Sequence, residues 1–283
     1  MSVIITMDSP GDLPKELIEE NGIIITPLSI LLGENSYLDG VEVEPNDLYD
    51  HVKKGGAFPK TAAVPPDTYY NTFKKIRDNK NEVVHIGLSS AISSTYQNAV
   101  LASRRLEGVY CVDSKSLCTA MGLLALKACD FRAKGMDAKK IAARVSKLVP
   151  KVSTTFLLRD LDFMNKGGRC SSLTRFGANM LNLKISITQN PETGELGVGK
   201  KYRGKIEVAY KQYINDCLSD INKIDTSRIV IADSGDVPPE TLSYAEGLIE
   251  SKGIFKEIIK AKAGCTISSH CGPGTIAIFY IKK

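Results

Sequence analysis

Side chains that could bind an anion gather at the ends of short β-branched runs in the N-terminal half of the sequence. These segments are Asp8-Ser9, the expected loop at Lys60-Thr61, Ser89-Ser90 with Ser93-Ser94-Thr95, and Asp113-Ser114. Ligands of open α/β sheets bind beyond the carboxyl ends of the strands, where hydroxyls and free helix N–H groups can hold one anion. Each segment alone is more often a helix N-cap. Their clustering at several strand ends favours an anion-binding site.

Two segments in the C-terminal half carry a cationic or titratable side chain beside glycines. Lys166-Gly167-Gly168-Arg169 places a guanidinium, which can pair with a carboxylate or phosphate, next to backbone that can turn sharply. The alternative is a helix C-cap followed by a solvated Arg. Ser268–Gly274 is expected to be a stiff turn that presents the His270 imidazole and the Cys271 thiol. A lone His is more often structural, and such a Cys is more often a buried, inert thiol.

Composition and missing motifs exclude several classes of protein. The 283 residues include 37 Lys and Arg and 32 Asp and Glu, and this net charge of +5 lacks the strongly basic footprint of a nucleic-acid-binding protein. Seven cysteines without a Cys-x-x-Cys pair predict reduced thiols in a cytoplasmic protein with no metal site. We find no secretory signal, membrane-spanning apolar run, Walker loop, Gly-x-Ser-x-Gly elbow or Gly-x-Gly-x-x-Gly fingerprint.

The order of strand-like and helical segments predicts how these residues are positioned. Residues 1–150 alternate β-branched runs with helical segments, which is typical of a parallel sheet flanked by helices. Residues 151–283 contain the turn-rich segment Asn190–Glu195 between two strand candidates, which indicates a hairpin. We therefore predict an α/β protein of two lobes, with an N-terminal parallel-sheet α/β lobe, a C-terminal α+β lobe and a boundary near residue 150.

The expected elements follow from hydrophobic periodicity. The expected strands are Val3–Thr6, Ile23–Ile25, Val83–Leu88, Val109–Val112, Val152–Leu158, Ile185–Thr188, Leu196–Val198, Ile229–Ala232, Ile254–Ile259 and Thr275–Ile281. The clearest helices are Tyr96–Leu106, Met121–Arg132, Ala138–Leu148, Ile206–Ile221 and Thr241–Ser251.

At these residues the sequence resembles the DegV family of bacterial fatty-acid-binding proteins, over nearly its whole length. Six short motifs in the family's order carry the resemblance: Met7-Asp8-Ser9 with Asp12-Leu13, Pro59-Lys60-Thr61, Ser93–Ala99, Asp113-Ser114, Lys166–Arg169 and His270–Gly274. The resemblance implies a fatty acid between or along the two lobes, with a buried acyl chain and its carboxylate in a polar cup. It also implies a non-catalytic subunit of bacterial fatty-acid kinase, which presents the carboxylate to a separate ATP-binding subunit for acyl phosphate formation in phospholipid metabolism.

The resemblance also assigns contacts to the fatty-acid carboxylate. Thr61 takes the place of the family's hydrogen-bonding threonine, and Ser93, Ser94 and Thr95 take the place of its Ser-Gly-Thr loop. Arg169 matches the arginine of the Gly-Gly-Arg signature, and His270 matches the histidine of the His-x-Gly-Pro-Gly turn.

Three further positions and two departures complete the comparison with the family pattern. Gly168 and Gly272 would shape the backbone of the two loops, and Arg203 falls near an often basic position that would help to dock the kinase subunit. The chain has Ala62-Ala63-Val64 where family members usually have Ser-Gln-Pro, and it has Ser94 where they usually have Gly. These departures change the hydroxyl donors that are available to a head group.

The fatty-acid hypothesis requires no cofactor and no metal. Its expected partners are a long-chain fatty acid and an ATP-binding kinase subunit. Transient contact with a membrane surface is compatible with this hypothesis, and no nucleic acid is expected to bind. One alternative is a stand-alone hydrolase with Ser93 as nucleophile and His270 as base, which needs both side chains within hydrogen-bond reach and an oxyanion hole. Another is a binder of a different small anionic metabolite, for which the pocket should be compact and polar. Phe156–Leu158, Phe163-Met164 and Met121–Leu124 are candidates for lining an acyl chain, although each is more typical of the core.

Overall fold

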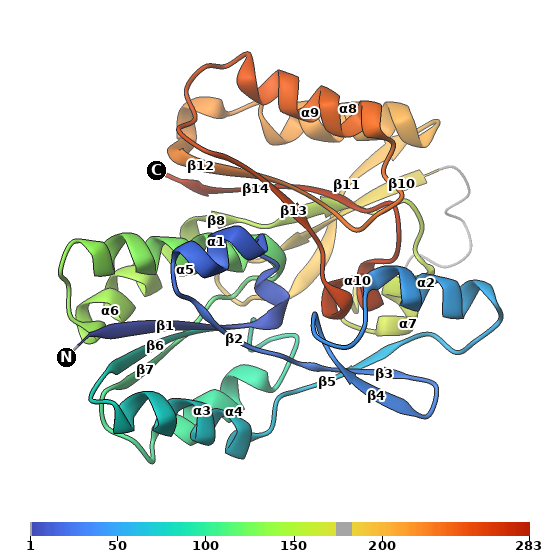
Figure 1. Ribbon diagram of the computed structural model, residues 1–283. Coiled ribbons are helices and arrows are strands. Elements are labelled where there is room, and N and C mark those ends of the chain that lie inside the picture. The colour runs from blue at the N-terminus through green and yellow to red at the C-terminus, as the bar shows by residue number, and fades with distance from the viewer. Residues whose placement is uncertain (1, 174–182) are drawn as a thin grey trace.

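The β-branched runs of the N-terminal half form a parallel sheet with strand order β2-β1-β6-β7 (Figure 1). The computed structural model describes residues 2–173 and 183–283. Its strands here are β1 (Val3–Asp8), β2 (Ile24–Thr26), β6 (Glu82–Gly87) and β7 (Val109–Asp113), and every neighbouring pair is parallel. Most side chains of β1 and β6 are buried, as expected for parallel strands that are covered on both faces. The predicted first lobe is confirmed.

Helices cover both faces of this sheet (Figure 1). They are α1 (Lys15–Glu20), α3 (Pro66–Asp78), α4 (Thr95–Ser103), α5 (Cys118–Ala133) and α6 (Ala138–Leu148). Helices α3 and α4 lie on one face, whereas α5 and α6 lie on the other. Helix α5 also contacts the second sheet, and 11 of its 16 residues are buried. A helix that is apolar on all sides is stable only when it is buried on all sides. Helix α5 is accordingly packed between the two sheets.

The second lobe is a mixed sheet with strand order β11-β10-β9-β14-β12-β13, and β8 also pairs with β14. Its strands are β8 (Val152–Ser153), β9 (Thr155–Leu157), β10 (Leu183–Gln189), β11 (Leu196–Arg203), β12 (Ile224–Asp233), β13 (Ile258–Lys262) and β14 (Ile276–Lys282). Strands β12 and β13 are parallel, and the other neighbouring pairs are antiparallel. Helices α8 (Ile206–Cys217) and α9 (Pro239–Glu250) cover the outer face. The predicted α+β lobe and its β10–β11 hairpin are confirmed.

Strands β10, β11 and β12 extend beyond their expected ranges, and the run over β8 and β9 and strand β13 also depart from theirs. The run Val152–Leu158 is interrupted at Thr154, because the Thr154 hydroxyl lies 2.7 Å from that of Ser116 and its carbonyl accepts the Gln189 amide. The last parallel strand begins at Ile258, because pairing with β12 starts at that residue.

A small antiparallel sheet with order β4-β3-β5 was not predicted. Its strands are β3 (Ser29–Leu32), β4 (Asn35–Leu38) and β5 (Lys60–Ala62), and α2 (Pro45–Lys53) lies nearby in the chain. The expectation that Lys60-Thr61 forms a loop is therefore wrong. A strand of three residues has no readable alternation, and its pairing with β3 is a tertiary effect.

Helices α7 (Asp162–Gly167) and α10 (Cys265–Cys271) pack against each other. Helix α10 also contacts α2, β3 and β5 of the N-terminal half. The expectation of a stiff turn over Ser268–Gly274 is wrong in its first half, because His270 lies in the last turn of α10 and the turn begins at Gly272. The Ser269 hydroxyl donates to the Cys265 carbonyl one turn earlier, and the Ser268 hydroxyl donates to the Ala263 carbonyl just before the helix, so both buried hydroxyls have partners. The cluster of buried residues around α5 includes residues of both halves, and the boundary near residue 150 stays a prediction.

Candidate functional site

A pocket between the lobes, called the interlobe pocket below, brings together five of the six residues predicted to contact a carboxylate. Thr61 reaches it from β5, Ser93 and Ser94 from the loop before α4, Arg169 from the segment after α7, and His270 from α10. Its volume is about 130 Å³. Much of the remaining wall is apolar and includes Leu88, Ile92, Leu117, Phe156, Met164 and Leu196. A few convergent polar groups in an apolar pocket suit an amphipathic ligand.

Thr61 and His270 form the polar contact across this pocket. Pairing of β5 with β3 places Thr61 opposite Ile30, and Thr61 Oγ1 lies 3.0 Å from His270 Nε2. Burial, and secondarily the positive charge of Arg169, lower the pKa of His270 to about 4. The imidazole is therefore neutral at pH 7. The neutral ring can donate a hydrogen bond to a hydroxyl or a carboxylate, or accept one from a hydroxyl. It does not neutralise the negative charge of a carboxylate.

The serine loop has both a capping role and a position in the pocket. Ser93 Oγ accepts the Thr95 backbone N–H at 3.2 Å and lies 2.7 Å from Thr95 Oγ1. Ser94 occupies the N-cap position of α4 without a side-chain cap bond. Thr95 is fully buried and is absent from the residues that line the pocket. Thr95 therefore positions Ser93 through their hydrogen bond rather than facing the pocket itself. A direct contact of Thr95 with a carboxylate stays a prediction, which this position does not favour.

Arg169 lies at the exposed side of the pocket. Its Nη1 donates to the Gly167 carbonyl at 2.8 Å, just after Gly168 ends α7 with a φ of 67°. Only glycine adopts this left-handed conformation without strain. Gly272 ends α10 with a φ of 68°, and a Cβ there would lie 2.7 Å from the Phe163 ring. Both glycines thus shape the segments that carry Arg169 and His270.

Arg203 lies away from this group. It is the exposed last residue of β11, and it is not among the residues that line the interlobe pocket. A contribution of Arg203 to partner docking stays a prediction.

A smaller apolar cavity continues the interlobe pocket. The two share Leu117, Phe156, Ile267 and Cys271, and the second cavity has a volume of about 20 Å³. Its further walls include Ala232, Ala263 and Ala277. The path therefore runs from the polar residues into the space between α5 and the second sheet.

Comparison with known proteins assigns this fold to a family. The model for the uncharacterised DegV family, COG1307, matches residues 2–283. A DegV domain-containing protein of Clostridium acetobutylicum is 30% identical over 99% of this chain and 98% of its own length. The chain belongs to the DegV family.

Solved DegV structures share the whole fold. A DegV family protein from Thermus thermophilus, described as fatty-acid binding, superposes with a TM-score of 0.89 at 24% identity, covering 100% of both chains. A stearic-acid-binding protein from Eubacterium ventriosum gives a TM-score of 0.86 at 23% identity, covering 100% of this chain and 99% of its own. The predicted two-lobed fold is confirmed by this agreement.

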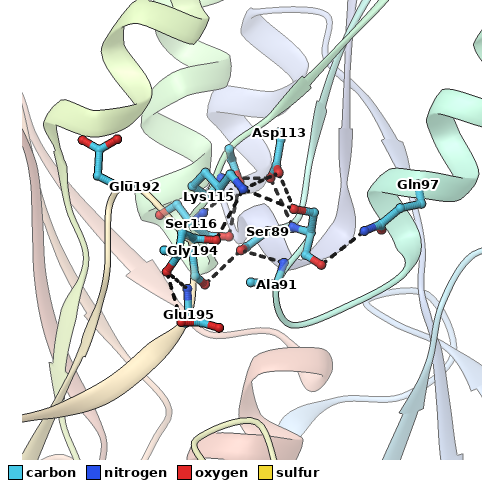
Figure 2. A network of polar contacts seen from close by, with 12 residues as sticks. Ser89, Ala91, Gln97, Asp113, Lys115, Ser116, Glu192, Gly194 and Glu195 are labelled. Carbon is cyan, nitrogen blue, oxygen red and sulfur yellow. Dashed lines mark hydrogen bonds and ion pairs between the residues drawn. The ribbon is translucent and has the colours of Figure 1, made fainter.

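A polar network, which the sequence did not reveal, fastens the β10–β11 turn of this DegV chain to the first lobe (Figure 2). The fully buried Ser89 donates to the Gly194 carbonyl at 3.0 Å, and Gln189 donates to the same carbonyl at 2.7 Å. Lys115 Nζ lies 3.3 Å from both the Asp113 carboxylate and the Thr193 carbonyl. Ser89 and Asp113 were singled out as strand-end residues, but here they hold the two lobes together. Their neighbours Leu88, Leu117 and Leu196 line the interlobe pocket.

The two alternative functions are not favoured by this geometry. Ser93 Oγ bonds to Thr95, whereas His270 Nε2 bonds to Thr61, so the nucleophile–base hydrogen bond of a serine hydrolase is not formed. The interlobe pocket is compact, at about 130 Å³, but much of its wall is apolar, in contrast to the polar pocket expected for a small anionic metabolite. Of the apolar runs suggested as lining, Phe156 and Met164 line the pocket, whereas Met121–Leu124 lie in the core.

The described residues also limit metal binding and membrane crossing. Across residues 2–173 and 183–283, His, Cys, Asp and Glu side chains form no group of three or more that could hold a metal ion. Within the same part of the chain, the helices are too short or too polar to cross a bilayer.

Proposed function

We propose that this DegV chain binds a long-chain fatty acid and presents its carboxylate to a separate ATP-dependent kinase subunit. The observation that carries the proposal is the interlobe pocket, in which Thr61, Ser93, Arg169 and His270 converge from four segments on an otherwise apolar space. Structural neighbours from Thermus thermophilus and Eubacterium ventriosum are described as binding fatty acids, which supports the same ligand class here.

The energetics suit an amphipathic ligand. Burying an acyl chain stabilises a complex by roughly 0.8 kcal/mol per CH₂, so a chain of about 16 carbons offers on the order of 10 kcal/mol before ordering costs. A buried carboxylate is costly unless it is hydrogen-bonded or paired. Hydroxyls at Thr61 and Ser93 and the Arg169 guanidinium are available for this purpose.

The same groups leave the carboxylate reactive. Hydroxyl donors and a neutral His270 orient the carboxylate oxygens without protonating them. An oxygen of the carboxylate can then attack the γ-phosphorus of ATP, the bond to the β–γ bridging oxygen breaks and ADP leaves, and the kinase subunit supplies the metal and the phosphate contacts for this step. In this proposal the chain itself is not a catalyst, and the exposed Arg203 is a candidate for contact with the partner.

Lipid mass spectrometry after denaturing extraction tests the binding step. We expect a stoichiometric fatty acid in the purified protein, or uptake of added stearate. Thr61→Val should weaken binding by about 1–3 kcal/mol, because one hydrogen-bond donor to the head group is lost. Thr68→Val is the matched control, since Thr68 is an exposed threonine on α3. A lipid-free protein that takes up no stearate would refute the proposal.

A hydroxylamine-trapping assay tests the presentation step. The stearate-loaded protein is mixed with ATP, Mg²⁺ and the ATP-binding subunit of a bacterial fatty-acid kinase, and acyl phosphate is captured as the hydroxamate. We expect product only when both proteins are present. Product from this chain alone would show that it is a catalyst, and failure with every such subunit would leave lipid binding as its whole activity.

A further inference from the structure

The two nitrogens of the His270 ring have very different surroundings. Nε2 lies 3.0 Å from Thr61 Oγ1, on the side of the interlobe pocket. Nδ1 is buried and has no hydrogen-bond partner among the described residues. It lies instead against Gly167, where a Cβ in place of the glycine hydrogen would be only 2.3 Å from Nδ1.

The Gly167 contact distinguishes between the two neutral forms of the ring. A Cβ is built along one Cα–H direction, so this short distance means that a Gly167 Cα–H points at Nδ1. A ring N–H at the same position would direct one hydrogen at another, whereas a ring lone pair there accepts a weak C–H···N contact. Buried N–H groups without a partner are also rarer than acceptors without one.

The doubly protonated form is disfavoured as well. Burial and the nearby Arg169 guanidinium lower the pKa of His270 to about 4, so the ring carries a single proton at pH 7. The other titratable groups of α7 and α10 do not contact the ring through a hydrogen bond in the described residues.

We propose that His270 is held as the Nε2–H tautomer, donates to Thr61 Oγ1, and thereby turns the Thr61 hydroxyl hydrogen toward the ligand. His270 is then a positioning residue that acts through Thr61, and Gly167 is the residue that enforces its tautomer. A hydroxyl that accepts from His270 can donate its own hydrogen elsewhere, and the interlobe pocket is the space it borders. In the opposite tautomer, Thr61 would donate to His270 and present only lone pairs to a carboxylate.

This inference rests on the proposed binding of a carboxylate, but its first test does not. The chain has three histidines, so long-range proton–nitrogen correlation spectra of ¹⁵N-histidine-labelled protein resolve three rings. The signals that disappear in His270→Gln belong to His270. We expect a protonated-type shift at Nε2 and an unprotonated-type shift at Nδ1, with and without stearate. The reverse pattern would overturn the inference even if stearate binds.

A pair of substitutions tests the action through Thr61. A glutamine amide nitrogen can occupy the place of Nε2, whereas an asparagine amide nitrogen corresponds to Nδ1. We expect His270→Gln to keep stearate affinity within about threefold, and His270→Asn to lose about tenfold, the value of one net hydrogen bond. Thr61→Ser keeps the hydroxyl and should lose less stearate affinity than Thr61→Val. Equal losses in the Gln and Asn variants would refute the role through Nε2, whereas wild-type protein that binds no stearate would refute the proposed function instead.

Discussion

Replacing Gly167 with Ala tests whether its contact with the His270 ring matters. Gly167 is the last residue of α7 and does not have a positive φ, so alanine fits its backbone. The added methyl would lie 2.3 Å from Nδ1, and the ring must retreat by about 1 Å to restore an ordinary contact. That retreat stretches the 3.0 Å bond between His270 Nε2 and Thr61 Oγ1.

The expected change in the free energy of unfolding combines two destabilising contributions and one stabilising contribution. Overpacking of a buried site costs about 1–3 kcal/mol, and loss of one hydrogen bond costs about 1 kcal/mol. Replacing glycine in a helix by alanine stabilises by about 0.5–1 kcal/mol. We expect Gly167→Ala to lower the free energy of unfolding by about 1–3.5 kcal/mol and, through the weakened hydrogen bond, the stearate affinity by about tenfold.

Urea denaturation and stearate titration measure these two quantities. Gly247→Ala is the matched control, because Gly247 lies within α9 and a Cβ there meets nothing within 4 Å. The control should be slightly stabilised and should bind stearate like wild type. If Gly167→Ala matches Gly247→Ala in both stability and affinity, the ring does not depend on Gly167 and the reasoning is refuted.

Three further predictions concern the same region. Because the folded pKa of His270 is depressed to about 4 from 6.5, the unfolded chain binds the proton more readily between these values, so this residue costs about 3 kcal/mol of stability as the pH falls from 6.5 to 4. The free energy of unfolding, measured by urea denaturation at several pH values, should fall more steeply for wild type than for His270→Gln as the pH falls through that window. Parallel plots of this free energy against pH would contradict the depressed pKa. Ala277 pairs across the sheet with Phe156, and both line the second cavity. Ala277→Leu should therefore lower the affinity for stearate about tenfold and leave the affinity for the shorter octanoate unchanged. Equal losses for both acids would indicate general misfolding. Ser89→Ala removes the 3.0 Å bond to the Gly194 carbonyl and should lower the free energy of unfolding by about 1 kcal/mol, and an unchanged urea midpoint would show that this inter-lobe bond is not stabilising.

Periodicity was sufficient to predict the two large sheets but not the small one. Runs such as Val83–Leu88 in β6 and Ile229–Ala232 in β12 are continuous, β-branched and buried, so their pattern reflects their environment. Strand β5 has three residues and depends on pairing with β3, which the local sequence does not encode. The segment of α10 is expected to be a turn because serines are typical of turns, yet the Ser269 hydroxyl donates to the Cys265 carbonyl within the helix and the Ser268 hydroxyl to the Ala263 carbonyl just before it.

The candidate site was predictable as a set of residues, but not as an arrangement. Thr61, Ser93, Arg169 and His270 were identified from residue type and family resemblance, and they do line one pocket. The contact of Gly167 with the His270 ring joins α7 to α10, and the Ser89–Gly194 bond joins the two lobes. Contacts between residues so far apart in the chain follow from tertiary packing, and no spacing in the sequence could reveal them.

The pocket volume has a consequence for how a fatty acid would enter. A cavity of about 150 Å³ holds a benzene molecule, so the 130 Å³ interlobe pocket accommodates a head group and a few methylenes of a long acyl chain. The rest of the chain would have to widen the path past Phe156 into the second cavity, between α5 and the second sheet. Leu88, Leu117, Phe156 and Met164 line this path and also belong to the buried core that joins the lobes. An acyl chain placed there becomes part of that core, and binding to the folded state alone raises stability with ligand concentration. The protein would then be most stable when loaded, and release of the lipid would require the lobes to separate at this seam.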